Sequence, residues 1–395
     1  MALRVLISGA GIAGSTLAYW LLHYGFEATI IEKAPRLRVG GYVIDFWGAG
    51  FDVADRMGIV PELLQQGYEV QEVRAVDGSG KTVASFPARA FFRASKGRYT
   101  TVSRAGLAAT IFHQIDGKVE AIFGDSVSRI EQNDQTVQVA FEHGPEREFD
   151  LVIGADGLHS AVRKLVFGSQ DQFEKYLGYK VAEFEAEGYR PRDELVYLLH
   201  TELHQQVGRF TMREDRTMFL FIFADDHADT GDLPAQKALL RKRFANSGWE
   251  CPQILQALDA TRELYFDRVS QIRMEARPGL WTQGRVTLVG DAASCVSLLA
   301  GQGSALAMVA AYVLAGELHR SKGDYPSAFA RYEQLFAPFV RGKQKAALRF
   351  AGFFAPKSRG SLFVRNQLMN LLRIPWFADF AIAGEITDKL ALPQY

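Results

Sequence analysis

A glycine-rich turn between two apolar runs, within the first 32 residues, constrains the fold more than any other feature. Val5 to Ile7 form the first run, and Gly9, Gly11 and Gly14 follow at once in G-x-G-x-x-G spacing. Leucine and aromatic residues then recur at helical spacing until a second apolar run, from Ala28 to Ile31. This order predicts a strand, a helix and a second strand that lies parallel to the first.

In a unit of this kind each of the three glycines is required for a different physical reason. The first permits a tight turn, the second lets the backbone approach a pyrophosphate, and the third lets the helix lie close to the sheet. The helix N-terminus presents free N–H groups to the phosphates. Glu32 ends the second run, where its carboxylate can accept hydrogen bonds from both ribose hydroxyls. We therefore predict a dinucleotide site for FAD or NAD rather than NADP, and the motif alone does not choose between those two.

Length and charge limit the possible functions. The chain has 395 residues, 48% of them hydrophobic, which indicates a soluble protein with two or three substructures. Lysine plus arginine equals aspartate plus glutamate at 45 each, so we expect no nucleic-acid partner. The two cysteines, Cys251 and Cys295, have neither metal-site spacing nor a disulfide pattern, and no metal is expected. No signal segment or membrane span is recognised, so the expected location is the cytoplasm.

Two further strand ends carry polar residues. After the apolar run at 151–153 comes GADGLHSAVR, with Asp156 at a sharp turn. This is either a second ligand-facing turn or an ordinary glycine turn with a helix N-cap. Near residue 285 another apolar run ends in Gly290 and Asp291, followed by Gly301-Gln302-Gly303 and a helix of small apolar residues. A buried helix explains this membrane-like composition, and Asp291 can accept a hydrogen bond from a ribityl hydroxyl.

The segment from about 179 to 273 has a different character, with apolar β-rich runs at 195–199, 206–212 and 217–224. It predicts an antiparallel sheet that walls an apolar substrate site. Phe210, Phe221 and Phe223 are candidates to line that site, as is Leu298 farther along the chain. For each single phenylalanine, a place in the core of the sheet is the alternative that we favour.

Together, GAGIAG with Glu32, GADGLHSAVR and GDAASCVSLLAGQG resemble the FAD-dependent class A monooxygenases of the para-hydroxybenzoate hydroxylase fold. Within that class, GGYVIDF and Arg104 resemble the tetracycline-inactivating and polyketide-tailoring members most. The resemblance implies an α/β fold: a Rossmann-type FAD domain (1–75, 98–178 and 274–340), an inserted antiparallel-sheet substrate domain (76–97 and 179–273) and C-terminal helices (341–395). The residues implied in non-covalent FAD binding are Gly9, Gly11, Ala13, Gly14, Glu32, Lys33, Arg38, Asp45, Arg104, Val127, Asp156, Gly290, Asp291, Gly301, Gln302 and Gly303.

The class also implies a reaction. NADPH or NADH binds transiently and reduces FAD, O2 forms the C4a-hydroperoxyflavin, and this species hydroxylates an aromatic or polyketide-like molecule. No fixed acid–base pair is expected, because a substrate phenol or enol supplies the electrons. Ser294, Leu298, Ala305 and Ala310 stand where many relatives have other residues. We therefore keep open a non-redox cyclase with FAD as scaffold, and a Baeyer–Villiger or epoxidising relative.

The stretch from 341 to 378 contains eight basic residues and no acid, interleaved with apolar residues at helical spacing. Pro356 and Pro375 interrupt it. Such helices can lie on an anionic membrane surface, or they can pack on the nucleotide domain with their basic face in water. We favour packing and expect no membrane contact, in a monomer or homodimer.

Overall fold

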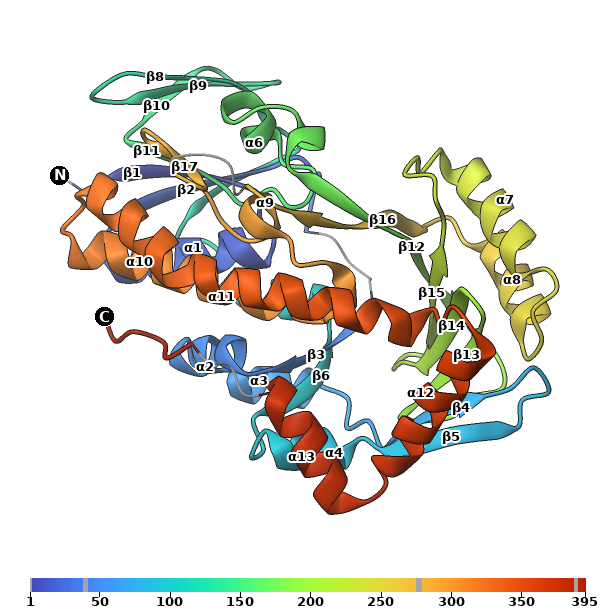
Figure 1. Ribbon diagram of the computed structural model, residues 1–395. Coiled ribbons are helices and arrows are strands. Elements are labelled where there is room, and N and C mark those ends of the chain that lie inside the picture. The colour runs from blue at the N-terminus through green and yellow to red at the C-terminus, as the bar shows by residue number, and fades with distance from the viewer. Residues whose placement is uncertain (1, 38–41, 275–278, 387–389) are drawn as a thin grey trace.

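A mostly parallel sheet forms one end of the molecule (Figure 1). The computed structural model describes residues 2–37, 42–274, 279–386 and 390–395. The sheet has the strand order β17-β18-β11-β1-β2-β7, and only the pairing of β17 with β18 is antiparallel. Its strands are β1 (Arg4–Ser8), β2 (Glu27–Glu32), β7 (Glu120–Phe123), β11 (Leu151–Gly154), β17 (Thr282–Gln283) and β18 (Val286–Leu288). The predicted strand–helix–strand unit is β1, α1 and β2.

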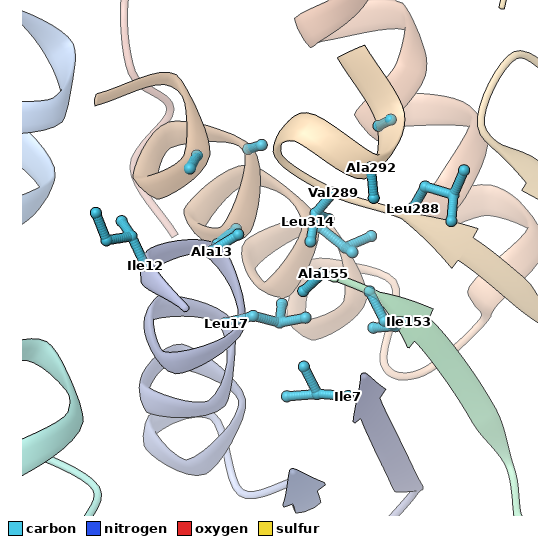
Figure 2. Packing of buried hydrophobic residues seen from close by; sticks show 14 of the residues in the cluster. Ile7, Ile12, Ala13, Leu17, Ile153, Ala155, Leu288, Val289, Ala292 and Leu314 are labelled. Carbon is cyan, nitrogen blue, oxygen red and sulfur yellow. The ribbon is translucent and has the colours of Figure 1, made fainter. Parts of the chain in front are cut away.

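Two buried helices cover this sheet. α1 (Ile12–His23) packs against α10 (Gly303–Arg320), in which an unbroken run from Leu306 to Leu318 is buried. Figure 2 shows side chains of α1, β11, β18 and α10 meeting in one apolar core, among them Leu17, Ile153, Leu288 and Leu314. This core accounts for the membrane-like composition of α10. No helix in the described ranges is long and apolar enough to cross a membrane.

A second sheet of seven strands, with the order β16-β12-β15-β14-β13-β4-β5, forms the other end (Figure 1). Only β13 and β4 run parallel. Its strands are β4 (Glu72–Val76), β5 (Thr82–Pro87), β12 (Glu174–Glu187), β13 (Val196–Glu202), β14 (Gln205–Thr211), β15 (Arg216–Ala224) and β16 (Tyr265–Ile272). α7 (Leu233–Phe244) and α8 (Cys251–Ala260) pack on one face of it. β4 and β12 begin a few residues before the expected boundaries at 76 and 179, and the division into domains stays a prediction.

Shorter elements complete the fold around the two sheets. β3 (Val43–Trp47) pairs with β6 (Tyr99–Ser103), and β8 (Val127–Gln132), β9 (Val137–Phe141) and β10 (Arg147–Phe149) form a small antiparallel sheet. The remaining helices before residue 325 are α2 (Ala49–Arg56), α3 (Val60–Gln66), α4 (Arg89–Ala94), α5 (Arg104–His113), α6 (Ala161–Val166) and α9 (Asp291–Ser294), with 3-10 turns at Gln170–Gln172 and Leu298–Ala300.

The C-terminal helices break where the sequence predicts, but they pack differently. α11 (Tyr325–Phe354) ends before Pro356, α12 (Arg359–Leu371) follows, and α13 (Pro375–Ile386) begins at Pro375. α11 packs along α10, whereas α12 lies on β5 and α13 on α4, so the expected packing on the nucleotide domain is wrong for these two. Because β5 and α4 cover only one side of each short helix, seven large apolar side chains stay exposed: Phe363, Val364, Leu368, Leu371, Ile374, Trp376 and Phe380.

One basic side chain of this segment is buried rather than solvated. Arg365 on α12 is only 4% exposed, and it donates to Gln206 Oε1 on β14 at 3.1 Å. Its guanidinium also stacks over the Phe353 ring. Burial lowers the pKa of Arg365 to about 10. The expectation of a uniformly solvated basic face is therefore also wrong at this position.

Gln344 on α11 joins the C-terminal helices to the rest of the molecule, and its replacement should be destabilising. Its Nε2 donates to Ile272 O (2.8 Å) and Cys295 O (3.1 Å) in a fully buried setting. Gln344→Leu removes this donor from Ile272 O and one of the two donors of Cys295 O, which also accepts from Ile272 N at 3.1 Å, and the loss of a buried donor costs about 1–3 kcal/mol. We expect a melting temperature several degrees lower, measured by calorimetry. The exposed neighbour Lys345→Gln is the control, and equal melting of both variants would contradict this role.

Candidate active site

A large cavity opens at the carboxyl ends of β1, β2, β11 and β18 and continues to the seven-stranded sheet. Parallel sheets bind ligands at this edge, because their strand-to-helix turns meet there. Its volume is about 1230 Å³. That exceeds the roughly 300–1,000 Å³ of most single-ligand pockets. The space is therefore sufficient for a dinucleotide and a second molecule.

The β1–α1 turn forms one wall, and its three glycines have different surroundings. Gly9 has a φ of +109°, and a Cβ there would lie 2.6 Å from Ala155 O. A Cβ on Gly14 would lie 1.9 Å from Gly9 O, so the helix approaches the turn as closely as the backbone allows. A Cβ on Gly11 would meet no protein atom within 4 Å, because this position faces the cavity. Ala13, the second residue of α1, also lines the cavity.

Glu32 and Lys33 line the cavity at the end of β2. The Glu32 carboxylate accepts from Ala10 N at 2.9 Å through Oε2 and from Ala34 N at 2.9 Å through Oε1. These bonds fix the carboxylate beside the glycine turn. Each oxygen has a second lone pair, so the group can still accept from a ligand hydroxyl. Arg38, predicted to lie beside the flavin, falls outside the described residues.

Asp156 satisfies both of the interpretations that the sequence left open. It lines the cavity, and its oxygens accept from Ser160 Oγ (2.5 Å) and Val162 N (3.0 Å). Ser160 in turn caps α6 by accepting from Arg163 N at 2.9 Å. Burial raises the pKa of Asp156, and these hydrogen bonds oppose the rise. The residue is therefore both part of a helix-capping turn and part of the cavity wall.

Arg163 is a positioning residue that the sequence analysis did not single out. It is fully buried, and its guanidinium donates to Ala292 O (2.8 Å) and Leu158 O (2.6 Å). These contacts tie the Asp156 turn to the segment that carries Asp291. The sequence contains this arginine within GADGLHSAVR, but nothing in the sequence identifies the carbonyl groups that accept its hydrogen bonds.

Asp291 and Arg104 both line the cavity. Burial raises the pKa of Asp291, and the positive charge of Arg104 opposes this. Gly290, just before Asp291, has a φ of +62°, and a Cβ there would lie 2.9 Å from the Ala13 Cβ. Figure 2 shows Ala13, Ala155 and Ala292 close together where these turns converge. Gly301 and Gly303 line the same wall, and no side chain caps the N-terminus of α10.

Other predicted cofactor residues do not line the cavity. Val127 is buried in the core, although the preceding Ser126 lines the cavity. Gln302 is the N-cap residue of α10 and is not part of the wall. Asp45 is a correction. Ile44 on β3 and Tyr42 just before this strand line the cavity, whereas Asp45, on the alternate face of β3, does not. Its Oδ1 accepts at 2.6 Å from both the Tyr99 and the Thr101 hydroxyl.

Three of the four predicted substrate-lining residues are also corrected. Phe221 and Phe223 point from β15 towards α7 and α8 and are completely buried there. Phe210 points to the other face of the sheet, where it packs against Met218 and Val43 and is equally buried. The core alternative is right for all three, because the strand period of two settles which face each residue occupies. Leu298 does line the cavity.

The substrate side of the cavity is instead lined by Tyr42, Tyr265, Glu183 and Ser297. Ser297 has a φ of +95°, a conformation that costs a non-glycine residue roughly 1–3 kcal/mol. His159 also lies on the wall, within 3.3 Å of an Asp267 oxygen through Nε2, and this contact raises the pKa of His159. These residues come from distant parts of the chain, so no local sequence pattern marks them.

A family model described as an FAD binding domain matches residues 2–323. The chain belongs to this FAD-binding family. A flavin-dependent monooxygenase from an unknown prokaryotic organism is 37% identical over 99% of this chain and 99% of its own length. Two solved structures match 100% of this chain. Tetracycline destructase Tet(55) is 32% identical, with 99% of its own chain covered and a TM-score of 0.85. Tetracycline destructase Tet(51) is 30% identical, with 100% of its own chain covered and a TM-score of 0.84. The resemblance to class A FAD monooxygenases is confirmed, and so is the predicted fold class.

This FAD-dependent monooxygenase has a site that fits its cofactor. The open space above Gly11 and the uncapped N-termini of α1 and α10 suit phosphates and a ring carbonyl. Glu32 suits the adenosine ribose, and Asp291 suits the ribityl chain. Bound FAD supplies the redox chemistry, while these residues bind and orient it.

Arg104 should affect both the binding and the reduction of the flavin. Its side chain is exposed to the cavity, and its charge acts on Asp291, Tyr42 and Tyr265. We expect Arg104→Ala to weaken FAD binding about tenfold, a typical loss for one charge-assisted hydrogen bond. Flavin titration of the apoprotein measures the affinity, and rapid mixing with NADPH measures reduction. Arg104→Lys, which keeps the charge, should retain more of both. Unchanged affinity and reduction in Arg104→Ala would exclude this role.

Proposed function

We propose that this enzyme uses NAD(P)H and O2 to hydroxylate an aromatic or polyketide-like small molecule. One observation carries the proposal: a single cavity joins the dinucleotide wall at Gly11 and Asp291 to a wall that contains Tyr42, Tyr265 and Leu298. A substrate at the second wall is therefore held next to the cofactor without an intervening barrier. The tetracycline destructases that the chain resembles support a polycyclic aromatic substrate class.

The protein's own contribution is binding, orientation and exclusion of water. Arg104 places a positive charge beside Tyr42, and the apolar surroundings of Leu298 and Val181 limit hydration. Ala305, where many relatives have another residue, packs closely against Gly50 of α2. A Cβ added to Gly50 would lie only 2.5 Å from the Ala305 Cβ. A larger residue at 305 would collide with α2. The two free cysteines are both buried, which supports a reducing, cytoplasmic location.

Coupled consumption of NADPH and O2 tests the proposal. The purified yellow protein should oxidise NADPH slowly alone and several-fold faster with tetracycline or a simple phenol, with O2 consumed in equal amounts and little hydrogen peroxide released. NADH is tested in parallel, because no second G-x-G-x-x-G unit is present to select one reductant. If NADPH does not bleach the flavin under anaerobic conditions, the cyclase alternative, with FAD as scaffold, replaces this proposal.

A further inference from the structure

The cavity wall contains a buried carboxyl group that no part of the reaction described above uses. Glu183 on β12 lines the cavity and is only 4% exposed. Its Oε1 has no hydrogen-bond partner among the described residues. A buried carboxylate without a partner is costly, and such groups are usually paired with a cation or donor. Glu183 therefore has unused hydrogen-bonding capacity at the cavity wall.

The neighbours of Glu183 make this arrangement specific. Val181 lies on the same face of β12, and Leu220 lies opposite on β15, so the immediate surface is apolar. Glu185, two residues on, also lines the cavity but is already paired: its Oε2 accepts from Arg216 Nη1 at 2.8 Å. Two carboxyl groups thus share one side of the strand, and among the residues that the structure describes only Glu185 of the two has a cationic partner. Glu183 is the one of the two whose charge, when it is ionised, has no cationic partner in the described ranges.

Two tyrosine rings stand beside this carboxyl. Tyr265 is the β16 residue paired with Glu183, and its ring centroid lies 6.2 Å from that of Tyr42, at a tilt of 46°. Tyr42 is close enough to feel the charges of both Glu183 and Arg104. Aromatic faces next to a carboxylate are the environment in which proteins bind ammonium groups. Arg104 lines the same cavity and its charge acts on both tyrosines, so it suits an electron-rich or anionic part of the same ligand.

We propose that Glu183 is the anchor of a subsite for a protonated amine carried by the aromatic substrate, with Tyr42 and Tyr265 as its walls. This inference rests on the proposed function, since it describes the substrate of the same cavity. It makes Glu183 a specificity-determining residue: the enzyme should prefer substrates that carry a basic nitrogen over neutral or anionic ones of equal size. The phenol end of such a substrate would lie towards Arg104 and the cofactor.

The ionisation of Glu183 is consistent with this role. Burial first, and the charge of Glu185 second, raises the pKa of Glu183 to about 8. The charged or titratable groups around it are Glu185 on its own strand, Tyr42 just before β3, Tyr197 on β13 and Tyr265 on β16, together with Arg216 on β15, which pairs with Glu185, and Arg104 on α5, whose charge acts on Tyr42 and Tyr265. An ammonium pairs only with the ionised carboxylate. Amine affinity should therefore fall as the pH falls below 8, whereas the affinity for a neutral analogue should not.

Three probes of one shape test the subsite: tyramine (cationic), tyrosol (neutral) and 4-hydroxyphenylacetate (anionic). Their binding to the FAD-loaded enzyme is followed at pH 8.5 and 6.5 through the flavin spectrum, without turnover. We expect tyramine to bind about tenfold more tightly than tyrosol at the higher pH, with the anion weakest. Glu183→Gln should remove that preference and its pH dependence. The exposed Glu187→Gln on the same strand is the matched control and should keep both.

Each contrary outcome is decisive. Equal affinity for tyramine and tyrosol, no detectable tyramine binding, or a preference that survives in Glu183→Gln overturns the subsite. A loss of tyrosol binding in Glu183→Gln would show that the carboxyl group instead donates to a neutral group. That result would also overturn the amine subsite. Failure of NADPH and O2 consumption with every compound would refute the proposed function. The binding measurements are read without turnover, so the two failures are distinguishable.

Discussion

Gly11→Val is expected to give a folded protein without flavin. Gly11 has a φ of −72° and a ψ of −173°, an extended conformation that valine adopts readily. A Cβ there meets no protein atom within 4 Å, so the substitution introduces no clash in the apoprotein. The new side chain occupies the space through which the pyrophosphate must approach the backbone. We expect FAD affinity to fall by at least about a hundredfold, since a steric block removes most of the phosphate contacts.

Flavin absorbance of the purified variant, and FAD titration of its apoprotein, measure this effect. Melting of Gly11→Val should match that of the wild-type apoprotein, which separates cofactor loss from unfolding. Full flavin occupancy in Gly11→Val would falsify the assignment of this turn. Gly11→Ala should have an intermediate affinity, because one methyl group fills less of the space.

Gly14→Ala should have the opposite phenotype, a large loss of stability. The added Cβ would lie 1.9 Å from Gly9 O and 3.2 Å from Ile7 Cγ2. The first contact is with main chain, so no side-chain rotation relieves it, and α1 must move away from β1. Overpacking of a core typically costs about 1–3 kcal/mol, and a main-chain clash of this size belongs at or above the upper end.

The melting temperature and the soluble yield of Gly14→Ala measure that cost, and Gly11→Ala is the matched control from the same turn. We expect a fall of about 5–10 °C for Gly14→Ala if it remains soluble, and almost none for the control. Similar stability of the two variants would show that the close approach of helix and turn at Gly14 is not required.

The nucleotide half of the site could be predicted because its residues are local. Gly9, Gly11, Gly14 and Glu32 lie in one strand–helix–strand unit, whose backbone requirements are readable in order along the chain. Asp291 follows the same logic, because it lies in the turn that follows a buried strand. The parallel sheet then brings these strand ends together without further information.

The substrate half could not be predicted in the same way. Phe221 and Phe223 have side chains suited to a substrate wall, but the two faces of a strand alternate, so a shift of one residue separates the cavity from the core. Glu183 lies on the cavity face of β12, yet its environment depends on contacts with β3, β15 and β16, far away in sequence. The packing of α12 and α13 likewise depends on β5 and α4, which the pattern of the tail itself does not specify.

The central claim is that this protein inserts one atom of molecular oxygen into an organic substrate. It is tested most directly by turnover with NADPH under oxygen-18 gas, using the compound that most stimulates NADPH oxidation. We predict a product that carries one heavy oxygen from the gas and none when the label is in the water, in an amount that matches the NADPH consumed. An unlabelled product, or recovery of all the consumed oxygen as hydrogen peroxide, would contradict the account.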